Sequence, residues 1–238
     1  MNRKILLFLI PLLCLSISGC SPQQAATPTP IPATVTPALD ADTLYDMLVK
    51  AMQDSDKGEI ARLLTVGAPV DRGNDLGITP LMIAAFKDDA EIIGLLLAAG
   101  ADPEVLSNAG LSALILAAQQ GKAKSIRALV EGGAKVNAVD DIADHNNTPL
   151  GWAVYLGQVE ATRELIALGG DINYIPSGQG DTPVISGVRA NRYECVKLVI
   201  EAKADLTIRN RMGKTALDYA KELGYQDLVD LLVAAGAP

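Results

Sequence analysis

The residues best suited to metal chemistry are gathered in one short stretch near the middle of the chain. His145 is the only histidine, and Asp140, Asp141 and Asp144 stand within the five positions before it. Carboxylates and an imidazole at this density can ligate a divalent cation. An EF-hand calcium loop, however, requires a glycine at its centre and a glutamate at its end, and this stretch has neither. We therefore predict no metal site and interpret the stretch as an enlarged polar loop, with weak calcium binding as the alternative.

Covalent catalysis would require a nucleophile beside a base, with a third group to orient that base. Cys195 is the only cysteine beyond residue 20, and it lies far from His145 along the chain. Its place in a helical pattern favours a buried thiol. Gly178-Gln179-Gly180 resembles part of a phosphate-binding loop, but no strand pattern precedes it, so we interpret it as a turn. We predict that the chain is not an enzyme and that it uses no cofactor.

Cys20 stands where a signal peptide could be cleaved and its own thiol acylated. Asn2-Arg3-Lys4 places positive charge at the start, and the apolar run over residues 5–17 suits the core of a signal peptide. This run is shorter than the roughly 20 residues of a membrane-spanning helix, which remains the alternative. It ends in Ile17-Ser18-Gly19-Cys20, which resembles a bacterial lipobox. The resemblance implies cleavage between Gly19 and Cys20 and acylation of the Cys20 thiol.

The segment after Cys20 is unlike the rest of the chain. Between residues 21 and 38, five of the eighteen positions are proline and four are threonine, with no charge and no apolar period. This composition is typical of an extended, disordered linker. We therefore predict that residues 1–19 are a removed signal peptide, residues 20–39 are the lipidated cysteine and linker, and residues 40–238 are the folded domain.

The composition limits both the fold and the partner. Hydrophobic residues make up 49% of the chain but aromatic residues only 4%, so the core must consist of Leu, Ile, Val and Ala, which favours helices. The formal net charge is -8, and loss of Arg3 and Lys4 with the signal peptide leaves 18 basic against 28 acidic residues, or -10. An acidic chain without clustered Lys and Arg argues against nucleic acid as the partner.

Beyond residue 40 the chain repeats itself. A Thr or Ser followed by Pro or Ala and then an aliphatic residue recurs at steps of 33, 36, 34 and 33 residues: Thr79, Ser112, Thr148, Thr182 and Thr215. A second marker, usually Gly-Ala, keeps nearly the same step at residues 67, 100, 133, 169, 203 and 236. Two markers that recur together at about 33 residues indicate a repeat array.

Each marker predicts a helix boundary. The hydroxyl of Thr or Ser caps the start of a helix, and proline suits its first position. Gly121, Gly157 and Gly224, with Asp88 and Asn191 in the equivalent places, are expected to end that first helix in a left-handed conformation. A second helix follows in each unit, and the Gly-Ala marker closes it.

These motifs resemble the ankyrin repeat, whose hallmarks are a Gly-x-Thr-Pro-Leu-His-x-Ala-Ala opening and a Leu-Leu-x-x-Gly-Ala-Asp close. The resemblance covers about residues 43–238. It implies an all-α solenoid of five repeats beginning near residues 76, 109, 145, 179 and 212, after a degenerate N-terminal capping repeat from Leu44 to Asp71.

The chain departs from the family pattern in two places. Where the family has histidine after leucine, this chain has Met82, Ile115, Gly151, Ile185 and Asp218. The hydrogen-bond network that the family forms through this imidazole is therefore expected to be absent. Lys203 replaces the closing glycine of the fourth complete repeat, where we expect a distorted turn.

The resemblance also implies where a partner binds, namely at the turn before each Thr-Pro-Leu motif and at the end of the first helix. Carried onto this chain, these positions are Asp75, Leu76, Ile78, Phe86, Lys87, Asn108, Gln119, Gln120, His145, Tyr155, Gln179, Arg189, Arg211, Met212 and Lys214. Leu76, Phe86, Tyr155 and Met212 are expected to form an exposed stripe, which is typical of interaction sites. Packing of Leu76 and Phe86 between repeats is the alternative.

Together these features predict a function in binding. We expect a lipid-anchored scaffold or adaptor that binds a protein partner in the bacterial cell envelope and faces the periplasm or the cell surface. The alternative is a regulator, such as an immunity-like inhibitor of one envelope enzyme.

Overall fold

The computed structural model describes residues 39–142 and 146–238, and the signal peptide, Cys20, the linker up to residue 38 and His145 lie outside them. Within the described residues every regular element is a helix, as the sequence predicts. The helices are α1 (Ala41–Asp54), α2 (Lys57–Thr65), α3 (Pro80–Lys87), α4 (Ala90–Ala98), α5 (Ala113–Gln119), α6 (Ala123–Glu131), α7 (Pro149–Leu156), α8 (Val159–Ala167), α9 (Pro183–Arg189), α10 (Tyr193–Glu201), α11 (Ala216–Leu223) and α12 (Gln226–Ala234).

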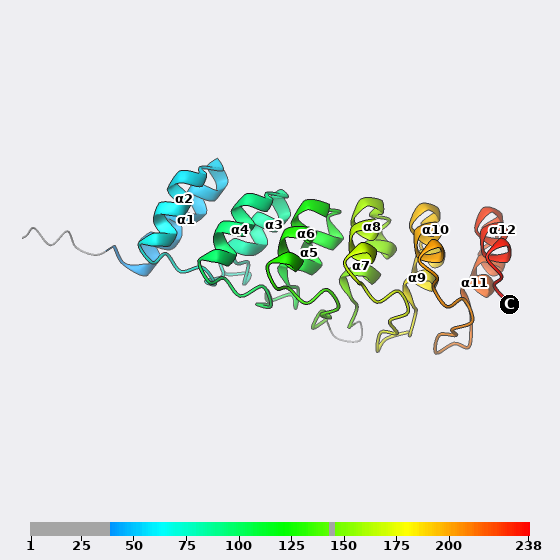
Figure 1. Ribbon diagram of the computed structural model, residues 1–238. Helices are drawn as coiled ribbons and strands as arrows, with labels where there is room; N and C mark the ends of the chain where they lie inside the picture. The colour runs from blue at the N-terminus through cyan, green and yellow to red at the C-terminus, as the bar shows by residue number, and fades with distance from the viewer. Residues whose placement is uncertain (1–38, 143–145) are drawn as a thin grey trace, which may run out of the picture. The chain divides into compact units, whose positions relative to one another are not determined.

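The helices form pairs that stack in two layers (Figure 1). The odd-numbered helices pack against one another in one layer, and the even-numbered helices pack in the other. The turns between successive pairs all project from the same edge of the stack (Figure 1). The first pair differs because α1 has 14 residues, whereas α3 to α11 in its layer have seven or eight.

The first helix of each unit starts where the sequence predicts. Thr79, Ser112, Thr148 and Thr215 each accept a hydrogen bond from the backbone N–H three residues later, at 3.1–3.3 Å. Thr182 stands in the same place with the same extended backbone, but its buried hydroxyl forms no hydrogen bond within the described residues. Four of the five predicted caps therefore form.

The predicted helix ends are also present. Asp88, Gly157 and Gly224 adopt left-handed conformations at the ends of α3, α7 and α11. The expectation of a distorted turn at Lys203 is wrong. Lys203 takes φ +70°, in the left-handed region that Gly100 and Gly169 occupy, and Ala204 N–H still bonds to Val199 at 3.2 Å, like its counterparts. The turn is kept, and a lysine backbone adopts the unfavourable conformation.

The core consists of small and medium aliphatic side chains, as the composition predicts. Paired alanines such as Ala84-Ala85 and Ala117-Ala118 are fully buried, which lets neighbouring helices approach closely. At the positions where the family has histidine, Met82, Ile115 and Ile185 are almost fully buried. Apolar packing therefore occupies the place of a polar side chain in three of the repeats.

Hydrogen bonds connect each unit to the next along both edges. At the turns, Asp71, Glu104, Asn137 and Asn173 each accept a bond from a backbone N–H of the following unit at 2.8–3.0 Å. At the opposite ends of the first helices, Gln158 donates to the Gln119 carbonyl at 2.7 Å and Arg192 to the Tyr155 carbonyl at 3.2 Å. Among the described residues, no helix is long and apolar enough to cross a membrane.

Candidate partner-binding surface

In the described part of the chain, four of the five projecting turns are closed at the base by a backbone hydrogen bond. In the first turn Asn74 N–H donates to the Ile78 carbonyl at 3.1 Å, and Gly77 N–H donates to the Asn74 carbonyl at 2.7 Å. Gly77 has φ +71°, and a Cβ there would lie 2.8 Å from the backbone nitrogen of Asn108 in the next turn. Glycine is therefore required both by the turn and by its neighbour.

Backbone hydrogen bonds join neighbouring turns into a row at three of the four junctions among the described residues, and at the other junction the Asn146 side chain donates to the Ser177 hydroxyl at 2.8 Å. Asn108 N–H donates to the Leu76 carbonyl at 3.1 Å, and Asp141 N–H donates to the Gly110 carbonyl at 2.9 Å. At the C-terminal end of the row, Arg211 N–H donates to the Gln179 carbonyl at 3.0 Å. Side chains at equivalent turn positions are consequently held at regular intervals along one edge.

The four large apolar residues of the predicted stripe are exposed. Leu76 is 67% exposed, Phe86 58%, Tyr155 47% and Met212 63%. At these exposed fractions Leu76 and Phe86 are not buried by packing between repeats, which was the alternative interpretation. Large apolar side chains at such exposure are typical of protein-binding surfaces. We call the face formed by the turn tips and the exposed ends of the first helices the turn face.

The other predicted contact positions fall into two groups. Those exposed are Asp75, Lys87, Asn108, Gln120, Gln179, Arg189 and Arg211, whereas Ile78, Gln119 and Lys214 are half-buried. Some of them also connect neighbouring units, because Lys87 Nζ donates to the Met52 and Gln53 carbonyls at the end of α1, at 2.6 and 2.9 Å. His145, and Asp144 beside it, lie outside the described residues.

The acidic stretch before His145 begins with a buried structural carboxylate. Asp140 is 1% exposed, accepts from Asn147 N–H at 3.2 Å and also accepts from the indole N–H of Trp152. This carboxylate therefore holds the base of the long turn to α7. Over residues 39–142 and 146–238, no three His, Cys, Asp or Glu side chains are grouped so that they could hold a metal ion.

Cys195 is buried in α10, as the helical pattern predicts. It is 1% exposed, and the Thr162 hydroxyl donates to its sulfur at 3.5 Å. Burial raises the pKa of the thiol above its ordinary value, so the reactive thiolate is disfavoured. The position therefore suits packing between α8 and α10, not nucleophilic attack.

A hydrogen-bonded cluster joins the last two turns, and the sequence analysis did not predict it. Asp181 and Asn210 are buried, and Asn210 Nδ2 donates to Asp181 Oδ1 at 2.6 Å and to Tyr219 Oη at 2.9 Å. Arg189 pairs with the other oxygen of Asp181, and its guanidinium lies 5.3 Å from the centre of the Tyr219 ring. The Lys214 ammonium lies 5.2 Å from the same ring centre. Two cations thus sit over one aromatic ring, an arrangement stabilised by attraction to its π-electrons.

A model of the family described as "Ankyrin repeats (3 copies)" matches residues 47–140, 81–175 and 150–238, which together cover residues 47–238. The chain belongs to the ankyrin repeat family. The family resemblance drawn from the Thr-Pro-Leu and Gly-Ala motifs is thereby confirmed, and with it the role of ankyrin repeats as protein–protein interaction modules. Proteins of this family are generally non-enzymatic scaffolds.

Curated relatives match parts of this ankyrin repeat protein. A putative ankyrin repeat protein of Rickettsia bellii is 37% identical over 62 residues, which are 26% of this chain and 36% of the relative. A mitochondrial disaggregase of Bos taurus is 30% identical over 175 residues, or 74% of this chain and 21% of the relative. Alpha-latroinsectotoxin-Lt1a of Latrodectus tredecimguttatus is 33% identical over 43% of this chain and 7% of the toxin. The matches span only about a third or less of these relatives' lengths.

Solved structures agree with the ankyrin fold. The ankyrin repeat domain of Bcl-3, described as a unique member of the IκB protein family, aligns with a TM-score of 0.75 at 28% identity. That alignment covers 81% of this chain and 86% of the Bcl-3 chain. EF0377, an ankyrin repeat protein, aligns with a TM-score of 0.71 at 26% identity over 79% of this chain and 97% of its own.

Proposed function

We propose that this ankyrin repeat protein is a lipid-anchored scaffold or adaptor of the bacterial cell envelope and that its turn face binds a protein partner. The anchor is Cys20, and the linker over residues 20–39 separates the anchor from the repeats. The chain itself performs no catalysis and needs no cofactor.

The exposed apolar row along the turn face carries the binding part of the proposal. Leu76 and Phe86 belong to the first complete repeat, Tyr155 to the third and Met212 to the fifth, and all four lie at turn tips or at the ends of first helices. Each would lose unfavourable contact with water when a partner covers it, at roughly 25 cal/mol for each Å² of apolar surface buried. Spacing across several repeats favours a macromolecular partner over a small ligand.

The burial of the two most reactive side chains, Asp140 and Cys195, supports a non-catalytic role. Asp140 is buried under the long turn, and Cys195 is a packed thiol with a raised pKa. A nucleophile needs a neighbouring base that is itself oriented by a third group. Within the described residues the hydrogen-bond partner of Cys195 is the Thr162 hydroxyl at 3.5 Å, which is not a base.

The anchor rests on the sequence alone. The order of charged start, short apolar run, Ile17-Ser18-Gly19-Cys20 and proline-rich segment is that of a lipoprotein precursor. Two or more acyl chains on one residue give stable membrane attachment, since each buried methylene contributes about 0.8 kcal/mol.

Lipidation is tested by metabolic labelling of expressing bacteria with an alkyne fatty acid. We expect label in the wild-type chain and in Cys14→Ala, because Cys14 leaves with the signal peptide, and none in Cys20→Ala. An unlabelled wild-type chain, or label that survives in Cys20→Ala, would contradict the anchor.

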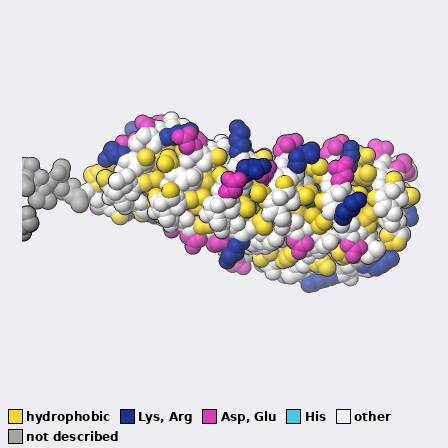
Figure 2. All heavy atoms as spheres, in the orientation of Figure 1, with side chains coloured by type: hydrophobic (Ala, Val, Ile, Leu, Met, Phe, Trp, Pro, Cys, Tyr) yellow, Lys and Arg dark blue, Asp and Glu magenta, His cyan; other side chains and the backbone are white. Residues whose placement is uncertain are grey.

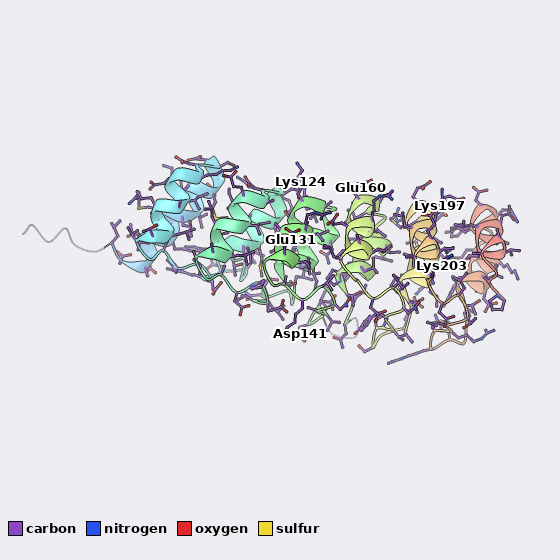
Figure 3. The ribbon with its side chains drawn as sticks, in the orientation of Figure 1. Lys124, Glu131, Asp141, Glu160, Lys197 and Lys203 are labelled. Carbon is purple, nitrogen blue, oxygen red and sulfur yellow. The ribbon has the colours of Figure 1, made fainter. Side chains whose placement is uncertain are left out.

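Partner binding is tested by photo-crosslinking in intact cells. A photoreactive amino acid replaces Phe86 or Tyr155 on the turn face, and matched controls carry it at Glu131 or Lys197. Both controls are exposed on second helices, Glu131 at the end of α6 and Lys197 within α10 (Figure 3), whereas Phe86 and Tyr155 lie at the ends of the first helices α3 and α7. We expect a discrete crosslinked protein from Phe86 and Tyr155 only. If that protein is an enzyme whose activity changes on binding, the scaffold role gives way to the regulator.

A further inference from the structure

The last turn of the stack differs in charge from the four turns before it. Residues 204–214 contain Arg209, Arg211 and Lys214 against Asp205, a net charge of 3 − 1 = +2. The corresponding stretches 68–78, 101–111, 134–147 and 170–181 carry -1, -2, -2 and -2 when Lys, Arg, Asp and Glu are counted. In a chain of net charge -8, the positive charge is therefore concentrated at one end of the turn face. Figure 2 shows Lys and Arg side chains gathered at that end.

We call the residues of this end the basic surface, namely Arg189, Arg209, Arg211, Met212 and Lys214. It combines charge with an apolar contact, because Met212 is 63% exposed at the tip of the turn, beside the exposed Arg211. Arg189, Arg209 and Lys214 pair with Asp181, Asp218 and Glu222, respectively. Among the described residues Arg211 forms no such pair, so the four cations of the basic surface exceed their three paired carboxylates by 4 − 3 = +1, and Arg211 carries that excess charge. Arginine is among the residues that contribute most of the binding energy in protein interfaces, and Arg211 stands here beside the exposed Met212.

Hydrogen bonds of the Asn210 side chain fix the conformation of the turn that carries the basic surface. Asn210 Oδ1 accepts the backbone N–H groups of Met212 and Lys214, at 3.0 and 3.2 Å. Its amide donates to the buried Asp181, which in turn pairs with Arg189. Because these contacts order the turn before a partner arrives, binding loses little further conformational entropy.

We propose that the basic surface binds a carboxylate-rich segment of the partner protein, with Arg211 contacting the acidic side chains and Met212 an adjacent apolar side chain. This assignment rests on the proposed function, since it names the chemistry of the partner at one end of the same turn face. The acidic turns before it repel such a segment, so the partner's acidic segment lies at the C-terminal repeats and nowhere else along the row.

The test uses the full chain purified in neutral detergent and a fluorescent, glutamate-rich peptide that carries one phenylalanine. Fluorescence anisotropy measures its affinity for the wild type, for Arg211→Glu and for Lys124→Glu. The two variants change the net charge equally, but Lys124 lies on α6 at the opposite edge (Figure 3). We expect Arg211→Glu to weaken binding about tenfold and Lys124→Glu about twofold or less, and added salt to weaken wild-type binding.

Several results would overturn the proposal. These are an absence of peptide binding to the wild type, equal loss in both variants, and displacement of the peptide by inorganic phosphate at equal concentration. Binding of Cys20→Ala to phosphatidylglycerol vesicles that disappears in Arg211→Glu would assign the surface to lipid instead. Failure here is separable from failure of the proposed function, because crosslinks from Phe86 and Tyr155 to a protein would persist.

Discussion

Asn210 donates its side-chain amide to Asp181 across 2.6 Å, and this buried bond joins two turns whose residues stand 29 positions apart. Asp181 also pairs with Arg189, so one carboxylate connects the last two repeats to the basic surface. The order of that surface therefore depends on Asp181, whose side chain is only 10% exposed.

Replacement of this carboxylate tests its structural role. We expect Asp181→Ala to lower the free energy of unfolding by about 2 kcal/mol, since it leaves the buried Asn210 amide and the Arg189 guanidinium without their shared acceptor. Asp141→Ala, in an exposed turn position, should change it by about 0.5 kcal/mol or less. Urea unfolding followed by circular dichroism measures both, and equal effects would contradict the role given to Asp181.

Two threonines at equivalent positions provide a matched test of helix capping. Thr148 Oγ1 accepts Gly151 N–H at 3.1 Å, whereas the buried Thr182 hydroxyl lacks a hydrogen bond within the described residues. We therefore expect Thr148→Ala to cost about 1 kcal/mol and Thr182→Ala close to nothing. Thermal unfolding of the two variants gives the comparison. A larger loss for Thr182→Ala would show that its hydroxyl forms a bond after all.

Lys203 offers a substitution that should stabilise the protein. Its φ of +70° is unfavourable for a residue with a Cβ, and glycine relieves that strain. We expect Lys203→Gly to add about 1 kcal/mol to the free energy of unfolding. The reciprocal control is Gly169→Ala, where a Cβ would contact nothing within 4 Å and only the backbone conformation at φ +89° is penalised. That variant should have a lower free energy of unfolding than the wild type. If the two variants had the same free energy of unfolding, the backbone at Lys203 would not be strained.

The thiol of Cys195 should be inert until the protein unfolds. Its pKa is raised mainly by burial, so the native state keeps the proton through neutral and mildly alkaline pH. With Cys14 and Cys20 changed to alanine, a disulfide reagent should label the chain slowly in buffer and rapidly in urea. Because the folded pKa exceeds the unfolded one, stability should fall as the pH rises above about 8.5, the ordinary thiol value. Rapid labelling of the native chain would contradict the burial.

The sequence predicted the architecture well because each repeat contains its own boundary signals. Thr79 and Thr148 with the prolines after them mark helix starts, and Gly157 and Gly224 mark helix ends. These signals depend on local backbone chemistry, which a sequence displays directly. The turn at Lys203 was misjudged because the stack on either side imposes a left-handed conformation that the residue itself disfavours.

The candidate site was predicted less completely. The exposure of Leu76, Phe86, Tyr155 and Met212 follows from the repeat register, so the sequence predicted it. The cluster of Asp181, Asn210 and Tyr219 depends on contacts between repeats, which no single repeat displays. The sequence does carry a pattern for the connections between turns, since Asp71, Glu104, Asn137 and Asn173 each stand four residues after the first residue of the Gly-Ala marker.

The most direct test of the central claim is the affinity of the protein crosslinked from Tyr155 for variants of the turn face and of the second helices. We expect Phe86→Ala and Tyr155→Ala to weaken binding at least about tenfold each, because exposed aromatic anchors dominate such interfaces. Glu131→Ala and Lys197→Ala, on the second helices α6 and α10 (Figure 3), should leave the affinity unchanged. Loss of binding in these two control variants, with retention in the aromatic ones, would contradict the account.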